Sequence, residues 1–182
     1  MTSAVTHNPR EGEQVLESDS NHRIEGPREL LARYEQAMID LDADALAELY
    51  ASDAVHEFGF IVPGHEPSYH GRDAIRAAYR AAWGAPSVRL VEMHHRALHE
   101  TTNPEMLVAE WAGTARSTAG KTVDLAGVLV VRARDGYLVH VRDYMDVFGL
   151  AYQSGRLQDL ARSADRASSS VQPGLPAPRR PH

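Results

Sequence analysis

The stretch MLVAEWAGTARSTAGKTVDLAGVLVVRARDGYLVHVRDYMDV, residues 106–147, decides the fold, because it alternates strand-forming runs with short turn sequences. The strand-forming runs are 106–117, 122–133 and 137–147. The turn sequences between them are Ala119-Gly120 and Asp135-Gly136. A fourth run of the same kind, 87–99, lies upstream of the turn-like Thr102-Asn103-Pro104. Strands joined by such short connections are antiparallel. Residues 87–147 are therefore predicted to form a four-stranded antiparallel meander.

Upstream of the meander, the apolar residues follow helical spacing. A first helix is predicted after Gly26-Pro27, and a second after Asp42 or Asp44, either of which can cap it. A third helix is predicted over about 73–84, and a short strand, 55–61, precedes it. Helices gathered before a meander predict an α+β domain in which the helices pack on one face of the sheet.

The length of 182 residues allows one domain with a sizeable core, which we place at 27–165. Residues 1–26 are polar and aperiodic, and residues 166–182 are rich in Ser, Pro and Arg. Both segments are therefore predicted to be disordered arms.

Composition and charge exclude several classes of function. The net charge of −6, with acidic and basic residues interspersed, argues against a nucleic-acid partner and against an anionic membrane surface. No apolar run reaches the roughly 18 residues that a membrane span needs. The chain has no cysteine, which excludes disulfides and thiolate chemistry. A cytoplasmic location is the default expectation.

The last predicted strand carries one carboxylate in an otherwise apolar row. Because side chains alternate along a strand, one face receives Tyr137, Val139, Val141, Asp143, Met145 and Val147. If this row faces the enclosed side of the sheet, desolvation raises the pKa of Asp143, as enzymes arrange for a general acid or base. The alternative is a structural acid paired with an arginine or with backbone donors.

Two further polar side chains are predicted to lie among apolar ones. His56 alternates with Phe58 and Phe60 on the first strand, and Tyr34 lies on the apolar face of the first helix. A buried tyrosine hydroxyl needs a hydrogen-bond partner. The alternative for both residues is a role in core packing. Glu110 is a further acidic residue on a predicted strand, for which a structural ion pair with Arg116 is expected rather than a catalytic role.

The ten histidines do not predict a metal site. His95 and His99 share a strand face but lie about 13 Å apart along it. His65 and His70 fall in a loop rich in Pro and Gly, where a surface role is common. Zinc and iron sites need three convergent ligands, and the sequence offers no such spacing.

Three motifs carry a family resemblance. They are YEQA at 34–37 with ALAELYASDAV at 45–55, GRDAIR at 71–76, and DGYL at 135–138 with VRDYMD at 141–146. In this order and spacing, residues 27–150 resemble the SnoaL-like branch of the nuclear-transport-factor-two-like superfamily. The resemblance implies a strongly bent antiparallel sheet that, with the N-terminal helices, forms a cone around an apolar pocket. It also implies a homodimer formed through the outer face of the sheet.

Two enzyme types of the superfamily match this chain only in part. Tyr34 occupies the position of the oxyanion donor of ketosteroid isomerases, but Phe58 stands where their catalytic Asp would be. Asp143 matches the last-strand Asp of limonene-epoxide-hydrolase-like enzymes, but Trp111 and Gly113 stand where these enzymes need Arg and Asp.

The SnoaL-like polyketide cyclases are the least contradicted match. The resemblance implies a cofactor-independent cyclase, isomerase or lyase of secondary metabolism, acting on a hydrophobic polyketide-like or terpenoid-like molecule. Asp143 would move the proton, and Tyr34 and His56 would donate hydrogen bonds to a developing oxyanion. The pocket walls would come from Phe58, Phe60, Trp111 and Met145. Two alternatives stay open: a non-catalytic binding or scaffold protein, and an epoxide hydrolase with a rearranged site.

Overall fold

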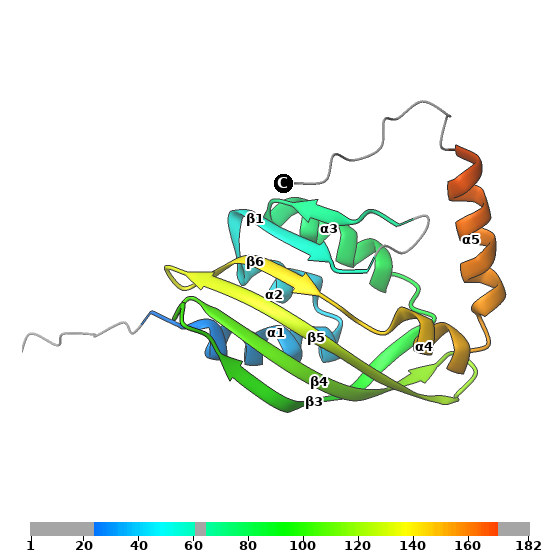
Figure 1. Ribbon diagram of the computed structural model, residues 1–182, viewed down its shortest axis with the longest axis horizontal. Coiled ribbons are helices and arrows are strands. Elements are labelled where there is room, and N and C mark those ends of the chain that lie inside the picture. Colours follow the sequence, from blue (N-terminus) through cyan, green and yellow to red (C-terminus); the bar gives the residue numbers. More distant parts are fainter. Residues whose placement is uncertain (1–23, 61–64, 171–182) are drawn as a thin grey trace, which may run out of the picture.

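The computed structural model describes residues 24–60 and 65–170. Five helices and six strands occur in these residues (Figure 1). The elements are, in order, α1 Pro27–Asp40, α2 Ala43–Glu48, β1 Tyr50–Phe58, β2 Ser68–His70, α3 Arg72–Trp83, β3 Val88–Glu100, β4 Met106–Ser117, β5 Thr122–Arg134, β6 Tyr137–Asp143, α4 Val147–Gln153 and α5 Leu157–Ser170. The predicted arm 1–26 lies almost wholly outside the described residues, and α5 runs past the predicted start of the C-terminal arm at 166.

The helix starts follow from local capping. Pro27 stands in the first turn of α1, where its missing N–H costs no hydrogen bond, and the Glu29 carboxylate accepts from the backbone N–H of Gly26 at 3.2 Å. Asp42, one of the two predicted caps, accepts from the N–H groups of Asp44 and Ala45 at 3.0 and 2.9 Å.

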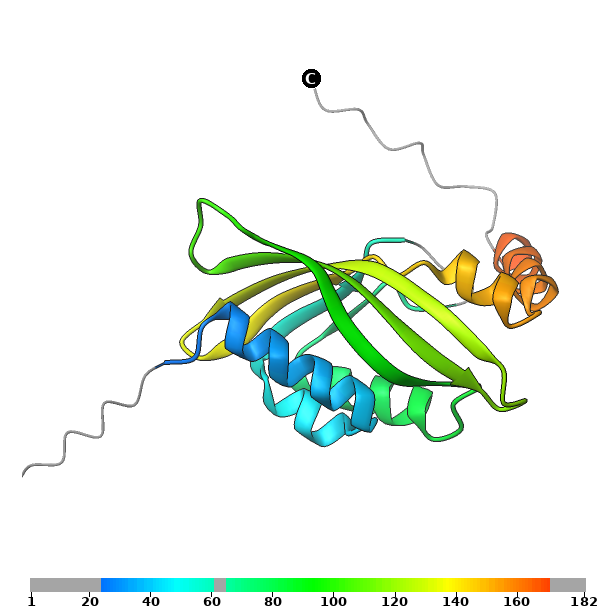
Figure 2. The same ribbon diagram turned by 90° about the horizontal axis from the view of Figure 1, so that it is seen from below.

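The six strands form one open sheet in the order β2-β1-β6-β5-β4-β3. The predicted meander is confirmed, since β3 to β6 pair as antiparallel neighbours. β1 adds to β6 in parallel, and the three-residue β2, which the sequence did not predict, pairs with β1. The sheet curves strongly over α1 to α3, which lie on its concave face (Figure 2). The expected α+β fold with a bent, mostly antiparallel sheet is therefore present.

The core fills the space between these helices and the concave face. Leu30, Leu46 and Ile75 contribute from α1, α2 and α3, and all three are fully buried. They belong to one cluster with the inward-facing residues of the sheet, which include Leu129 and Val141. Among the described residues, no helix combines the length and hydropathy that crossing a membrane requires.

The predicted alternation along the last strand is only half right. Val141 and Asp143 point inward, but Leu138 is fully buried while Tyr137 is 45% exposed. A register shift in the pairing of β5 with β6, between Arg132 and Ala133, exchanges the two rows at this end. The strand also ends at Asp143 rather than Val147, because Asp146 caps α4.

Candidate active site

Asp143 is the last residue of β6 and faces the core. It pairs with Leu129 of β5, and only 8% of its surface is exposed. Burial raises the pKa of Asp143 from its usual value near 3.8 to about 7, although the N–H of Met145 donates to the carboxyl group and opposes the shift. Its Oδ1 atom is buried without a hydrogen-bond partner among the described residues. Asp143 is thus a carboxyl group that can hold or release a proton near neutral pH.

His56 of β1 joins two tyrosines in the core. Its Nδ1 lies 2.8 Å from the hydroxyl of Tyr50, and its Nε2 lies 3.2 Å from the hydroxyl of Tyr79 on α3. Burial lowers the pKa of His56 to about 4, so the ring is neutral at neutral pH. A neutral imidazole donates from one nitrogen and accepts at the other. One tyrosine therefore donates to His56, and the other accepts from it and keeps its own proton free to donate.

The hydroxyl of Tyr34 extends this cluster from α1. Tyr34 is 1% exposed, and its hydroxyl lies close to that of Tyr79 without a hydrogen bond of normal geometry to any described residue. Burial is the largest cause that raises the pKa of Tyr34, and the charge of Asp143 raises it further. Tyr34 is therefore a protonated donor within electrostatic reach of the carboxyl group.

Trp111 of β4 adds a second buried donor without a partner among the described residues. Trp111 pairs with Gly127 of β5, and a Cβ atom on Gly127 would lie 2.8 Å from the indole Nε1. The indole can lie across β5 only because Gly127 has no side chain. Its Nε1–H has no acceptor among the described residues. An unpaired buried donor costs free energy, so this group is available to a polar atom of a bound molecule.

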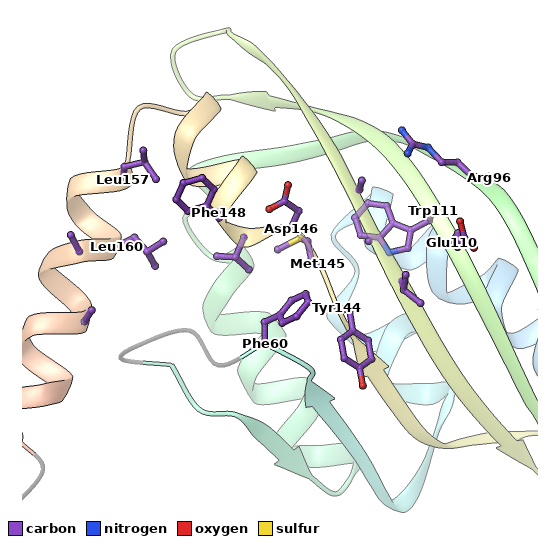
Figure 3. Close-up of a pocket in the computed structure, with 16 residues that line it drawn as sticks. Phe60, Arg96, Glu110, Trp111, Tyr144, Met145, Asp146, Phe148, Leu157 and Leu160 are labelled. Carbon is purple, nitrogen blue, oxygen red and sulfur yellow. The ribbon is translucent and has the colours of Figure 1, made fainter.

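A cavity of about 930 Å³ is lined in part by Trp111 (Figure 3). Glu110 and Val128 line it from the convex face of the sheet, and Leu157 and Leu160 line it from α5. Asp143 is not among the lining residues, whereas its neighbour Met145 is. The cavity therefore lies mainly on the opposite face of the sheet from Asp143.

Three of the four residues predicted to form the pocket walls line this cavity, and one does not. Phe60, Trp111 and Met145 line the cavity. Phe58 does not line it; its ring instead packs edge-on against His56 and Tyr69, at centroid distances of 5.0 and 5.8 Å. Phe58 therefore shapes the polar cluster rather than the cavity.

Tyr50 and Tyr79 are the members of the cluster that sequence reasoning missed. Tyr79 lies on the apolar face of α3, the same signal that singled out Tyr34 on α1. A tyrosine on a core-facing helix stripe needs a partner for its hydroxyl, so the same signal could have identified Tyr79, whereas Tyr50 begins β1 and lies on no helix.

Other predicted polar residues have structural partners. Glu110 accepts from Nε2 of His99 at 2.8 Å, which corrects the expected pair with Arg116. His95 contacts Glu35 of α1 through a short hydrogen bond. Within the described ranges, no group of three or more His, Asp or Glu side chains converges as a metal site would require.

The comparisons with known proteins agree with this fold. The model of the SnoaL-like domain matches residues 13–141. An uncharacterized PhzA/B-like protein of Pseudomonas aeruginosa is 26% identical over 118 residues, which are 64% of this chain and 82% of that protein.

Two solved structures show the same architecture. A candidate isomerase of Bacillus subtilis superposes with a TM-score of 0.64 at 22% identity, covering 71% of this chain and 92% of that one. A candidate polyketide cyclase of Xanthomonas campestris superposes with a TM-score of 0.56 at 20% identity, covering 70% of this chain and 95% of that one. Since the family model spans well over half of the residues, the chain belongs to the SnoaL-like family of the nuclear-transport-factor-two-like superfamily.

Proposed function

We propose that the protein is a cofactor-independent enzyme that moves a proton on a hydrophobic small molecule, as a cyclase, isomerase or lyase does. The observation that carries this proposal is the buried Asp143 carboxyl group, which has a pKa of about 7 and an Oδ1 atom without a partner among the described residues. A catalytic group works best when its pKa lies near the working pH. A purely structural acid would be paired with a cation or fully hydrogen-bonded.

In the proposed reaction, Asp143 acts first as a base. Its carboxylate takes a proton from a carbon next to a carbonyl group of the substrate. The electron pair of that C–H bond forms the C=C bond of an enolate, and the π pair of the C=O bond moves onto the oxygen. Tyr34 and Trp111 each hold an unpartnered buried donor that could stabilise this oxygen. The protonated Asp143 then returns the proton to carbon, to oxygen or to a leaving group, which restores the starting state.

His56 supports this reaction through Tyr79. Both of its ring nitrogens are engaged by tyrosine hydroxyls, so no nitrogen is left for the substrate. If Tyr50 donates to Nδ1, then Nε2–H donates to Tyr79, whose own proton points onward to Tyr34. We therefore assign to His56 the role of a positioning residue.

The walls around the acid suit an apolar substrate. Met145 lies two residues after Asp143, beyond the end of β6, and Met145 and Trp111 both pack against the core and border the cavity. We propose that the substrate approaches Asp143 from this end of the sheet.

Deuterium exchange tests the proposal whatever the final product is. The protein is incubated in D₂O with a panel of apolar ketones and β-keto esters, and the exchange of C–H for C–D is followed by NMR. The wild type should accelerate exchange for part of the panel. Asp143→Asn should lower the rate by about 10²–10⁴-fold, while Asp124→Asn, which removes an exposed carboxylate of β5, should not.

The outcomes separate catalysis from binding alone. Exchange that is equally fast with wild type and Asp143→Asn would remove Asp143 from the mechanism. Compounds that raise the melting temperature but never exchange or change would identify a binding protein without catalysis.

A further inference from the structure

The cavity on the convex face is lined in part by charged side chains. Three charged side chains line it: Arg96 of β3, Glu110 of β4 and Asp146 before α4. Figure 3 shows Arg96 and Glu110 at one end of the cavity and Leu157 and Leu160 of α5 at the other. A molecule that fills this space must therefore be elongated, with its polar and apolar ends separated.

The two carboxylates of the cavity are already occupied. Glu110 accepts from Nε2 of His99 at 2.8 Å. Asp146 accepts from the N–H of Gly149 at 2.8 Å and so caps the first turn of α4. Each carboxylate therefore already has a hydrogen-bond partner within the protein.

Arg96 differs from both, because its guanidinium has no hydrogen bond or ion pair within the described residues. Its placement follows from the strand itself. The pairing of β3 with β4 shifts register between His95 and Ala97, which leaves Arg96 as the extra residue of a bulge. Bulges redirect a side chain, often at functional sites. Arg96 is thus held at the cavity without a partner of its own.

The remaining lining is largely apolar. Phe148 on α4 and Phe60 after β1 are 66% and 57% exposed, and both border the cavity together with Met145. α5 adds Leu160, Ala161 and Ala164 on the side that faces the cavity. Large exposed apolar side chains gathered around one concavity are typical of a binding site.

We propose that this cavity binds an elongated hydrophobic monocarboxylate, with the carboxylate at Arg96 and the hydrocarbon against Phe148 and α5. An arginine fork matches a carboxylate with two parallel N–H···O bonds. Arg96 is the one basic side chain among the described residues that line the cavity, so it can offset a single negative charge, and Glu110 and Asp146 repel any further charge on a ligand. The site lies mainly on the opposite face of the sheet from Asp143 and does not depend on the proposed catalysis.

Equilibrium binding of a fluorescent fatty acid tests the proposal. The full chain is titrated with dansylaminoundecanoic acid and, separately, with the primary amide of the same probe, at neutral pH. The acid should bind saturably and more tightly than the amide. Arg96→Gln should weaken the acid by about tenfold and leave the amide unchanged, since a charge-assisted hydrogen bond is lost.

Two further variants make the result specific. Arg116→Gln removes the same charge from the convex face of β4 at a residue outside the cavity, and should bind both probes as the wild type does. Leu160→Asp places a charge in the apolar wall and should weaken both probes. The proposal is overturned if the full chain does not bind the acid saturably, if acid and amide bind equally, or if Arg96→Gln and Arg116→Gln behave alike.

Discussion

The indole of Trp111 lies across Gly127 of the neighbouring strand, so closely that a Cβ atom there would lie 2.8 Å from Nε1 and 2.9 Å from Cε2. The two residues are direct partners in the pairing of β4 with β5. This packing places the buried N–H of Trp111 over the inner face of the sheet, on the row next to Asp143. A single methyl group decides whether the indole can stay there.

Gly127→Ala should therefore displace the indole. We expect a loss of about 1–3 kcal/mol in the free energy of unfolding, since overpacking a core forces side chains off their preferred rotamers. Urea denaturation followed by tryptophan fluorescence measures this loss. The double variant Trp111→Phe/Gly127→Ala should lose less than the sum of the two single variants, because the smaller ring leaves room for the methyl group. Additive losses would mean that the indole does not rest on Gly127.

The tautomer of His56 is the next testable feature. We expect a neutral ring protonated at Nε2, because this form lets Tyr50 donate to Nδ1 and lets Tyr79 donate onward. Nitrogen-15 spectra of the imidazole report the tautomer, and should show a neutral ring down to about pH 5, since burial lowers the pKa of His56 to about 4. An Nδ1–H form, or protonation near the usual pKa of about 6.5, would contradict this assignment.

The hydrogen bonds on the two sides of His56 can be tested one at a time, with Tyr50→Phe and with Tyr79→Phe. Each variant leaves one buried nitrogen of His56 without its partner, so each should cost about 1–3 kcal/mol in the free energy of unfolding. Only Tyr79→Phe removes the hydroxyl that interacts directly with that of Tyr34, so it should also lower the rate of deuterium exchange. Equal rates in the two variants would remove the positioning role of His56.

α5 should matter for binding more than for stability. Leu157 and Leu160 border the cavity and do not belong to the core cluster, whereas Leu150 of α4 packs against that cluster. A chain that stops after Arg156 should change the free energy of unfolding by less than about 1 kcal/mol, roughly 2–4 °C in melting temperature. It should also lose affinity for dansylaminoundecanoic acid.

Leu150→Ala provides the contrast, with a loss of stability of at least about 1 kcal/mol. Calorimetry of the chain that stops after Arg156 and of Leu150→Ala measures both losses of stability. A large drop in melting temperature on removal of α5 would make it part of the core.

The meander could be predicted from the sequence because its signals are local. The turn between β5 and β6 needs two consecutive residues with positive φ, and Asp135 and Gly136 have φ of 52° and 78°. Asp-Gly is among the dipeptides that adopt this conformation most readily. β2 was missed because its three residues become a strand only by pairing with β1, a contact that local pattern does not encode.

The site was predictable in part for the same reason. Alternation placed Asp143 in the apolar row correctly, since the register shift in β6 lies nearer the start of the strand. The link from His56 to Tyr79 joins β1 to α3 and depends on how the helix packs, so no spacing in the sequence predicts it. The cavity was expected inside the cone, but the described cavity depends on the position of α5, which the sequence pattern does not give.

Asp143 and His56 should act on stability in opposite directions over the same range of pH. Burial raises the pKa of Asp143 from 3.8 to about 7, so between these values the folded chain holds a proton that the unfolded chain has lost. The free energy of unfolding then falls as the pH rises, by about 1.4 kcal/mol per pH unit. Burial lowers the pKa of His56 from 6.5 to about 4, so here the unfolded chain holds the extra proton and the free energy of unfolding rises with pH.

Between about pH 4 and 6.5, the contributions of Asp143 and His56 to the pH dependence of the free energy of unfolding cancel in the wild type. A variant that removes one of the two residues should therefore show the contribution of the other. Asp143→Asn should become less stable relative to wild type as the pH falls through this range, by up to roughly 3 kcal/mol, and more stable than wild type above pH 7. His56→Gln should show the reverse slope, because only the buried Asp143 remains. Denaturation of all three proteins at matched pH measures the differences, in which the other titrating groups cancel. Parallel pH profiles would show that neither residue is perturbed by its burial in the core.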